Sequence, residues 1–262
     1  MTELSPYQRI AKELRDKILS GELAPGAELP SETAIADREN LTRKTVSRAF
    51  EQLRSEGLIV TTQGARSKVR SRPRFDHVAT GENFRDRQAT GKPNDIAEAE
   101  AQGYRGKNKL LFFGDASAPA EVAKLLGVEV GAKVVMRDVL NVVVEEGKPD
   151  EPMKSIRCYY RHDFAAGTAL AESEKIPGGI ASLIESPDGP FRRTIARFTE
   201  DVELRMPRPD EAETLAIPPG VPVARILRTM YDVSGEPLEV LDSLLPGDRF
   251  SLHYVITVPG KP

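Results

Sequence analysis

Basic and small polar side chains that could contact DNA lie close together between residues 42 and 48. They are Thr42, Arg43, Lys44, Thr45, Ser47 and Arg48. Arginine presents a two-pronged donor that fits the acceptor edge of guanine, and the N–H groups at a helix start face phosphate. These residue types therefore indicate a recognition helix. The alternative is an amphipathic helix that turns a basic face to water.

A second polar and basic group follows in a short predicted hairpin. Two strand-like runs, 58–62 and 67–70, flank a turn over residues 63–66. Gly64 at the tip allows a close approach to a groove, and Gln63, Arg66 and Lys68 lie beside it. The hairpin is typical of a wing that contacts DNA next to a recognition helix.

Three predicted helices position these groups. The first runs from a capping box at Ser5 to Gly21, a shorter second helix begins near Ser31, and Thr42 caps a third that ends at Gly57. An apolar stripe on the third helix faces inward and contains Val46, Ala49, Phe50 and Leu53. Three helices and a basic-tipped hairpin predict a winged helix-turn-helix. A solvated basic face does not explain the caps, the stripe, the hairpin and the charge together.

The distribution of charge also favours DNA as a partner of the N-terminal part. Residues 1–78 hold 14 Lys and Arg against 11 Asp and Glu, a net charge of +3 within a chain of net charge −3. Residues 38–74 hold 10 basic against 3 acidic side chains. A basic module on an acidic remainder is typical of a local contact with a polyanion.

The composition excludes several other classes of protein. The 262 residues contain one cysteine, Cys158, which excludes an intramolecular disulfide and a cysteine-based zinc site. No apolar run is long enough to cross a bilayer, and the sequence has no glycine-rich nucleotide loop or nucleophile-elbow motif. We therefore expect a cytoplasmic protein with no membrane contact, no metal, no other cofactor and no enzymatic activity.

Two diverged copies of one pattern occupy the C-terminal part. Residues 118–149 and 209–237 each indicate a helix, a glycine, a strand and a Gly-x-Pro turn, and a second strand follows at 155–160 and 238–245. This repeat predicts an α+β domain with an antiparallel sheet and pseudo-two-fold order. Residues 73–108 have little apolar periodicity and are expected to form a linker that runs into this domain.

Residues 7–69 contain a series of short motifs, among them Pro25-Gly26, Leu29-Pro30-Ser31-Glu32, Thr42-Arg43-Lys44-Thr45-Val46 and Glu56-Gly57-Leu58. With these motifs, the segment resembles the DNA-binding domain of the GntR family of bacterial transcription regulators. The resemblance implies that Thr42, Arg43 and the wing Gly64 contact DNA. Ser31 and Thr33, at the start of the second predicted helix, complete the set of DNA-contact candidates. Ser47 stands where the family often has arginine, which leaves the preferred base open.

The remainder, from about residue 109, contains the motifs Gly147-Lys148-Pro149, Thr199-Glu200, Gly220-Val221-Pro222-Val223 and Gly235-Glu236-Pro237-Leu238-Glu239. With these motifs, it resembles the UTRA effector domain of HutC-type regulators, which has a chorismate-lyase-like fold. The resemblance implies a winged helix-turn-helix over 1–72, a linker over 73–108, and an effector-binding and dimerisation domain over 109–258.

Such a domain implies a small-molecule effector. An arginine on a strand would meet a phosphate or carboxylate, and glutamates would accept hydrogen bonds from hydroxyl or amine groups. The candidates are Arg137, Glu200 and Glu239, with Tyr160 and Tyr254 as walls or hydroxyl donors. In the structural alternative, Arg137 pairs with one of the two glutamates and the tyrosines only pack.

These features together predict a one-component transcription regulator. We expect a repressor that binds a palindromic operator as a homodimer, with half-sites about 34–36 Å apart when they lie one turn apart. A small metabolite would modulate its affinity for double-stranded DNA. Two alternatives remain open, namely a second domain that only dimerises and a domain that retains chorismate-lyase-like activity.

Overall fold

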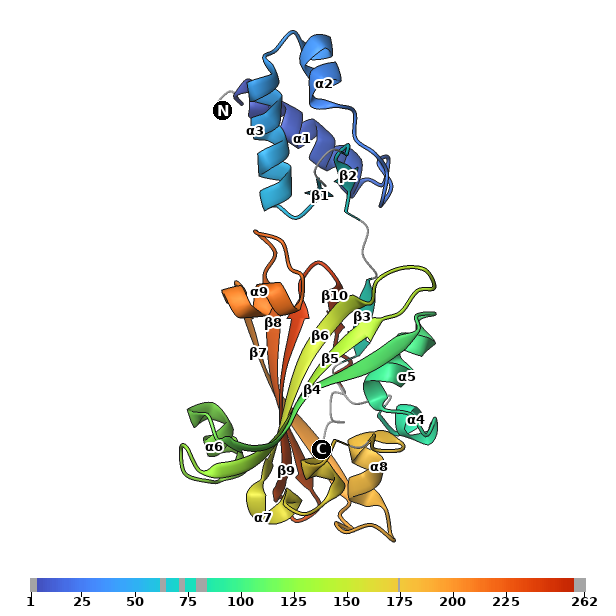
Figure 1. Ribbon diagram of the computed structural model, residues 1–262, viewed down its shortest axis with the longest axis vertical. Coiled ribbons are helices and arrows are strands. Elements are labelled where there is room, and N and C mark those ends of the chain that lie inside the picture. Colours follow the sequence, from blue (N-terminus) through green and yellow to red (C-terminus); the bar gives the residue numbers. More distant parts are fainter. Residues whose placement is uncertain (1–3, 62–64, 71–73, 79–83, 174, 257–262) are drawn as a thin grey trace, which may run out of the picture. The chain divides into compact units, whose positions relative to one another are not determined.

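The computed structural model describes residues 4–61, 65–70, 74–78, 84–173 and 175–256. The chain divides into two compact units (Figure 1). One contains Met1–Arg74 with Met206–Pro222, and the other contains Phe75–Arg205 with Val223–Pro262. None of the described helices is long and apolar enough to cross a membrane.

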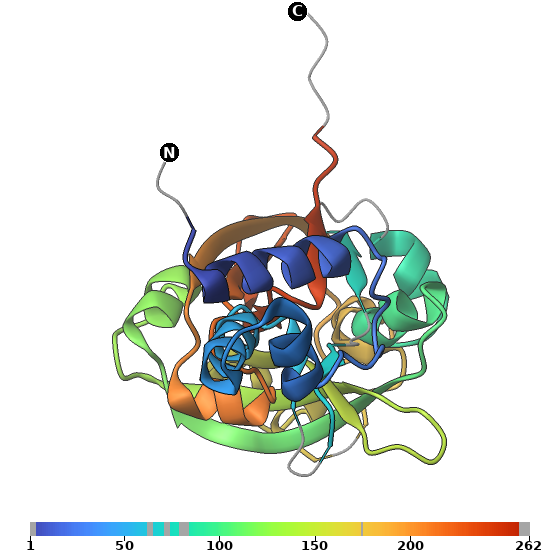
Figure 2. The same ribbon diagram turned by 90° about the horizontal axis from the view of Figure 1, so that it is seen from above.

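The first unit begins with the three helices that the sequence predicts. They are α1 (Pro6–Leu19), α2 (Glu32–Glu39) and α3 (Arg43–Ser55). Ser5 donates its backbone N–H to Gln8 Oε1 at 3.0 Å, which completes the capping box. The left-handed backbone of Asn40, with φ of 52°, ends α2 and turns the chain into α3. Figures 1 and 2 show α1 lying across α3.

Helix α3 is held by its apolar stripe. Val46, Ala49, Phe50 and Leu53 are buried in one core with residues of α1, α2 and the strands. The strands β1 (Ile59–Val60) and β2 (Lys68–Val69) pair antiparallel. The core thus fixes which face of α3 points outward.

The second unit contains a six-stranded antiparallel sheet. Its strands are β4 (Gly106–Ser117), β5 (Lys133–Val143), β6 (Glu151–Arg161), β7 (Ile195–Arg205), β8 (Val223–Asp232) and β9 (Pro237–Pro246). The order across the sheet is β4-β5-β6-β9-β8-β7. Along the chain, the order of strand, helix, strand and strand occurs twice, first with α6 (Ala120–Leu126) and then with α9 (Pro209–Thr214), although α9 belongs to the first unit. The antiparallel sheet and its two-fold order confirm the predicted α+β class.

Short elements cover one face of this sheet. They are α4 (Phe84–Ala89), α5 (Asn94–Ala101), α7 (His162–Ala165), the 3-10 helix η1 (Ala169–Ala171) and α8 (Gly179–Glu185). Figure 1 shows α4, α5 and α8 on the opposite side from α6. Helix α6 packs on the other face, in a core that includes Tyr159, Leu227 and Val240. Each layer therefore covers one set of alternating strand residues.

The segment 73–108 differs from the linker that the sequence suggests. It contains β3 (Phe75–Val78), α4, α5 and the start of β4, and β3 pairs in parallel with β10 (Phe250–His253). The apolar periodicity is weak because these elements are short and bury few large side chains, chiefly Phe75 and Phe84. The second unit thus begins at β3.

We expect Phe50→Ala to loosen the three-helix core selectively. Phe50 is 1% exposed, and truncation of a buried phenylalanine costs about 3–5 kcal/mol of unfolding free energy. Hydrogen exchange of peptides from α1 and α3 should become faster, while exchange in β5 and β6 stays unchanged. Glu51→Ala, at an exposed position of the same helix, is the control. Equal exchange in the two variants would contradict this account of the core.

Candidate functional site

The start of α3 presents a row of polar and basic groups to the surface. Thr42 caps the helix, because its Oγ1 accepts the Thr45 N–H at 3.2 Å. Arg43 and Lys44 follow on the exposed face, opposite the buried stripe. The Arg43 side chain is 76% exposed, and its Nε lies 3.6 Å from Glu32 Oε2 of α2. The guanidinium is thus available at the surface while α2 supplies a nearby carboxylate.

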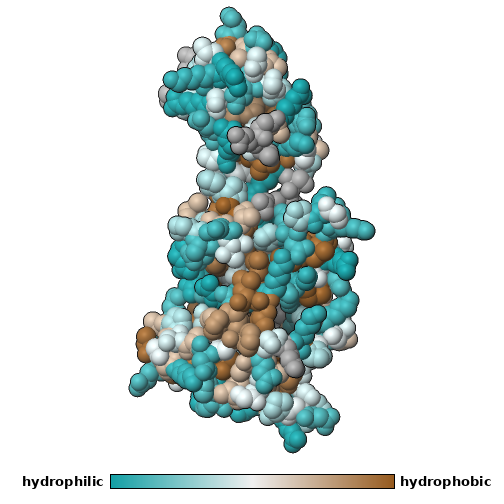
Figure 3. Space-filling model, in the orientation of Figure 1, coloured by the Kyte–Doolittle hydropathy of each residue, from teal (hydrophilic) through white to brown (hydrophobic). Residues whose placement is uncertain are grey.

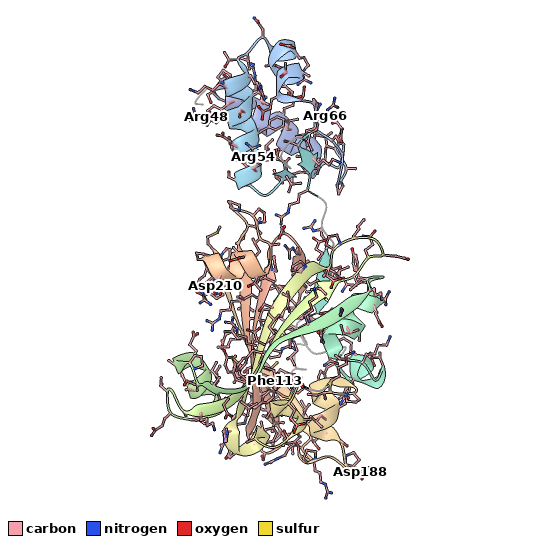
Figure 4. All side chains as sticks on the ribbon, viewed as in Figure 1. Arg48, Arg54, Arg66, Phe113, Asp188 and Asp210 are labelled. Carbon is pink, nitrogen blue, oxygen red and sulfur yellow. The ribbon has the colours of Figure 1, made fainter. Side chains whose placement is uncertain are left out.

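The remaining candidates on α2 and α3 differ in solvent exposure and in their contacts. Arg48 is exposed, and its guanidinium carbon lies 4.0 Å from the centroid of the Tyr7 ring on α1. Thr45 and Ser47 are half-buried. On α2, Ser31 accepts the Ala34 N–H at 3.1 Å as the helix cap, and Thr33 is exposed. Figure 4 labels Arg48 and Arg54 on α3 and Arg66 in the hairpin region.

The basic residues of the hairpin lie around one acidic side chain. Lys68 Nζ is 3.4 Å and Arg66 Nη1 is 3.9 Å from the carboxylate of Glu28. Both basic side chains are exposed. Gln63 and Gly64 lie outside the described residues. Tyr7, Glu28 and Glu32 were not predicted as partners of the basic groups, since these contacts depend on tertiary packing.

The second unit contains a cavity of about 710 Å³ between the sheet and its covering elements. Apolar side chains such as Phe198, Ile226 and Met230 form much of its lining. Cavities of this size and character are typical of small-molecule sites. Among the predicted effector residues, the lining includes Arg137, Glu200 and Glu239.

The two predicted tyrosines have different environments. Tyr160 is fully buried behind the lining and donates its hydroxyl hydrogen bond to Glu239 Oε2. Tyr254 is 42% exposed and does not belong to the cavity lining. The structure therefore connects Tyr160 with the cavity through Glu239 and leaves Tyr254 outside it. Tyr254 follows β10 near the end of the described chain, where no local pattern indicates its direction.

Arg137 binds main-chain carbonyls. Its Nη1 donates to the carbonyl oxygens of Ala169 at 3.2 Å and Leu170 at 3.1 Å, and also to that of Glu172. These groups belong to η1 and the residue that follows it. Arg137 is 6% exposed and thus ties η1 to the sheet.

The two predicted glutamates have partners of their own. Arg228 pairs with Glu200 Oε1, whereas Glu200 Oε2 is buried and has no hydrogen-bond partner among the described residues. Burial raises the pKa of Glu239, which favours its protonated form, although the Tyr160 hydroxyl acts in the opposite direction. Burial also raises the pKa of the adjacent Cys158 thiol, so Cys158 behaves as a small buried group.

The cavity wall also contains a buried cluster of charged side chains that the sequence did not predict. Glu98 of α5 meets His77 Nδ1 at 2.8 Å, Arg87 Nη1 at 3.1 Å and Lys154 Nζ at 3.2 Å. We call these four residues the Glu98 cluster, and all of them line the cavity. Burial acts to raise the pKa of Glu98, but Lys154, His77 and Arg87 together hold it well below its usual range. Three of the four residues lie in the segment expected to be a linker. No local sequence pattern therefore predicted that they would be in contact.

Two protein-family models match this chain, one in the helical N-terminal part and one over the sheet domain. The model of the bacterial regulatory proteins of the gntR family matches residues 6–69, and the UTRA domain model matches residues 101–251. The chain belongs to the GntR family. It is a transcriptional regulator of the HutC type, with a UTRA domain for effector binding.

Relatives of this regulator match over nearly their full length. An HTH-type transcriptional regulator of Streptomyces coelicolor is 28% identical, over 97% of this chain and 94% of the relative. The HTH-type transcriptional repressor NagR of Bacillus subtilis is 26% identical, over 95% and 94%. A solved GntR-family transcriptional regulator superposes with a TM-score of 0.59 at 25% identity, over 97% of this chain and 98% of that one.

We expect Glu98→Gln to destabilise the second unit. The change leaves Lys154 and Arg87 buried without a counter-charge, which costs about 3–5 kcal/mol of unfolding free energy near neutral pH. The folded pKa of Glu98 lies below the ordinary value of 4.5, so its stabilisation is present above about pH 4.5 and is lost as the pH falls toward the folded pKa. Urea unfolding as a function of pH should show this acid loss in the wild type only.

The matched control is Glu100→Gln on the same helix. Glu100 pairs with Lys92, and the two side chains are 41% and 50% exposed. We expect this variant to change stability little. If the two glutamine variants unfold alike, the Glu98 cluster does not hold α5 on the sheet.

Proposed function

We propose that this GntR-family regulator is a repressor that binds a palindromic operator as a homodimer and releases it when a small metabolite enters the cavity. The observation that carries the DNA-binding part is the capped start of α3, where Arg43 is exposed on the first turn. The proposed contact residues are Ser31, Thr33, Thr42, Arg43, Lys44, Thr45, Ser47, Arg48, Gln63, Gly64, Arg66 and Lys68. Since the target is chromosomal DNA, we assign the protein to the cytoplasm.

The effector part of the proposal is supported by the cavity and by one unsatisfied acceptor. Glu200 Oε2 is buried and lacks a hydrogen-bond donor among the described residues. A buried acceptor without a donor is costly, so a ligand that donates to it gains affinity. Arg137, Glu200 and Glu239 line the proposed site, and Tyr160 supports Glu239.

A route from the cavity toward the DNA-binding part is available through β3. This strand is the first element of the second unit along the chain, and its His77 contacts the cavity residue Glu98. A ligand that changes the surroundings of Glu98 would therefore act on the segment that leads to the DNA-binding helices. Thermodynamic linkage then requires that DNA and effector alter each other's affinity by the same factor.

The alternative proposals give the second unit a different role. It would serve only to dimerise, or it would carry chorismate-lyase-like activity. Relatives named as transcriptional regulators and repressors favour a non-catalytic role. Thermal-shift measurements with metabolites and an assay of chorismate turnover separate these roles.

The proposed dimer has a candidate surface on the edge strand β4. Leu111, Phe112 and Phe113 are 53%, 42% and 41% exposed on a strand that pairs on one side only. Figure 3 shows hydrophobic residues gathered where Figure 4, in the same orientation, labels Phe113. Large exposed apolar side chains on a sheet edge are typical of an association surface.

We expect Arg43→Ala to weaken binding to the promoter DNA of the protein's own gene by about 1–3 kcal/mol, because a base-edge or close phosphate contact is lost. Lys68→Ala should weaken all sequences alike and lower the salt slope by about one unit. Fluorescence anisotropy with labelled DNA at several salt concentrations measures both effects. Lys124→Ala, on the exposed face of α6, is the charge-matched control. An Arg43→Ala affinity within about twofold of the wild-type value would refute the recognition helix.

We expect Phe113→Asp to shift the protein from dimer to monomer. A carboxylate at the centre of an apolar contact loses its hydration without gaining a partner. Sedimentation velocity measures the shift, and Val130→Asp at a 71% exposed position before β5 is the control. A Phe113→Asp protein that sediments like the control would place the dimer contact elsewhere.

A further inference from the structure

The Glu98 cluster is buried deeply enough for its charge balance to matter. The side chains of Lys154 and Glu98 are each 6% exposed, and those of His77 and Arg87 are 11% and 12% exposed. Charges in such surroundings interact strongly and must be matched by opposite charges or hydrogen bonds. The net charge of the cluster therefore indicates which charge a ligand must carry to bind there.

The cluster holds more positive than negative charge. Burial lowers the pKa of His77 despite its hydrogen bond to Glu98, so His77 is neutral near pH 7. Lys154 and Arg87 then share the single carboxylate of Glu98. Among the described residues, Glu98 is the only carboxylate that forms an ion pair with Lys154 or Arg87. Within these four residues, positive charge therefore exceeds negative charge by one.

Other acidic groups on the cavity wall are engaged elsewhere. Glu200 pairs with Arg228. Asp95 accepts a hydrogen bond from the neutral Asn141 amide at 2.6 Å, so it keeps its charge. Glu239 is bound by the Tyr160 hydroxyl. Among the described residues, none of these three carboxyl groups forms an ion pair with Lys154 or Arg87.

The same cations retain hydrogen-bond donors for a ligand. Arg87 Nε is buried and has no acceptor among the described residues. Lys154 carries three N–H donors, and its contact with Glu98 uses one direction. An incoming anion would thus gain charge-assisted hydrogen bonds from groups that are already ordered.

The surroundings of the cluster are apolar. Lys154 Nζ lies 6.0 Å from the centroid of the Phe250 ring, and Phe250 packs in one core with Ile226 and Leu245. Ile226 and Leu245 also line the cavity. An anion that binds here would carry an apolar body along these side chains.

We propose that the Glu98 cluster receives the acidic group of the effector, through Lys154 and Arg87, and that the effector is an organic anion with an apolar body. This inference rests on the proposed effector function of the cavity. The subsite is distinct from Arg137, whose Nη1 donates to the carbonyls of η1. The acidic group is a carboxylate or a phosphoryl group, since both present oxygens to an ammonium and a guanidinium.

The test compares acids with their uncharged amides on the full chain without DNA. Thermal shift and calorimetry would use phenylacetate against phenylacetamide, and hexanoate against hexanamide, each at about 10 mM. At least one acid should raise the Tm of the wild-type protein and bind about tenfold or more tightly than its amide. Phenyl phosphate beside phenylacetate distinguishes the phosphoryl group from the carboxylate.

Variants locate the preference for acids. Lys154→Met should abolish it, and Lys154→Arg should retain it, because arginine restores the charge. Arg87→Gln provides a second reduction of charge if Lys154→Met fails to fold. Lys124→Met on α6 changes charge by the same amount outside the cavity and should leave the preference intact.

Three results would overturn the assignment. They are the absence of any rise in Tm with the acids, equal binding of acid and amide, and an acid preference that survives in both Lys154→Met and Arg87→Gln. Binding of promoter DNA by the same wild-type preparation separates this failure from failure of the proposed regulator function. A protein that binds its promoter but shows no acid preference keeps the regulator role and loses this subsite.

Discussion

Burial of charge in the second unit depends on contacts that join particular elements across the cavity wall. Glu98 reaches from α5 to Lys154 on β6, and Arg137 reaches from β5 to the carbonyls of η1. Arg228 and Glu200 join β8 to β7. The contacts of Glu98 and Arg137 hold α5 and η1 over the sheet, because a displaced element would leave a buried charge without its partner. The arrangement that stabilises the fold therefore also sets the electrostatics of the cavity.

The helices of the first unit could be predicted because local sequence patterns define them. The capping residues Ser5, Ser31 and Thr42 precede α1, α2 and α3, and the stripe from Val46 to Leu53 is buried. Helix caps and apolar stripes are formed by residues that are close in sequence, so they can be predicted from the sequence alone. The partners of the basic groups were not predictable in this way. The ring of Tyr7 beneath Arg48 is an example, since only the packing of α1 on α3 brings the two together.

In the second unit, the turns were predictable and the long-range contacts were not. Gly147 and Gly235 mark the two hairpins of the repeat, and both have positive φ, which glycine adopts freely. The parallel pairing of β3 with β10 joins distant parts of the chain, and no periodicity in four residues could indicate it. The contact between Glu98 and Lys154 could not be predicted for the same reason, because the two residues are far apart in the sequence. Of the predicted effector residues, Arg137, Glu200 and Glu239 line the cavity because each lies on a long strand with regular alternation.

The pairing of β6 with β9 has a consequence for how the cavity arises as the chain folds. Within each half of the sheet, paired strands are close along the chain, whereas Ser155 of β6 pairs with Leu244 of β9. Closing such a long loop has a high entropic cost, so this pairing is expected to form late. The cavity wall contains Lys154 from the first half and Glu239 from the second. During synthesis on the ribosome, the site is therefore incomplete until the last hairpin has emerged, and an effector would stabilise only the finished chain.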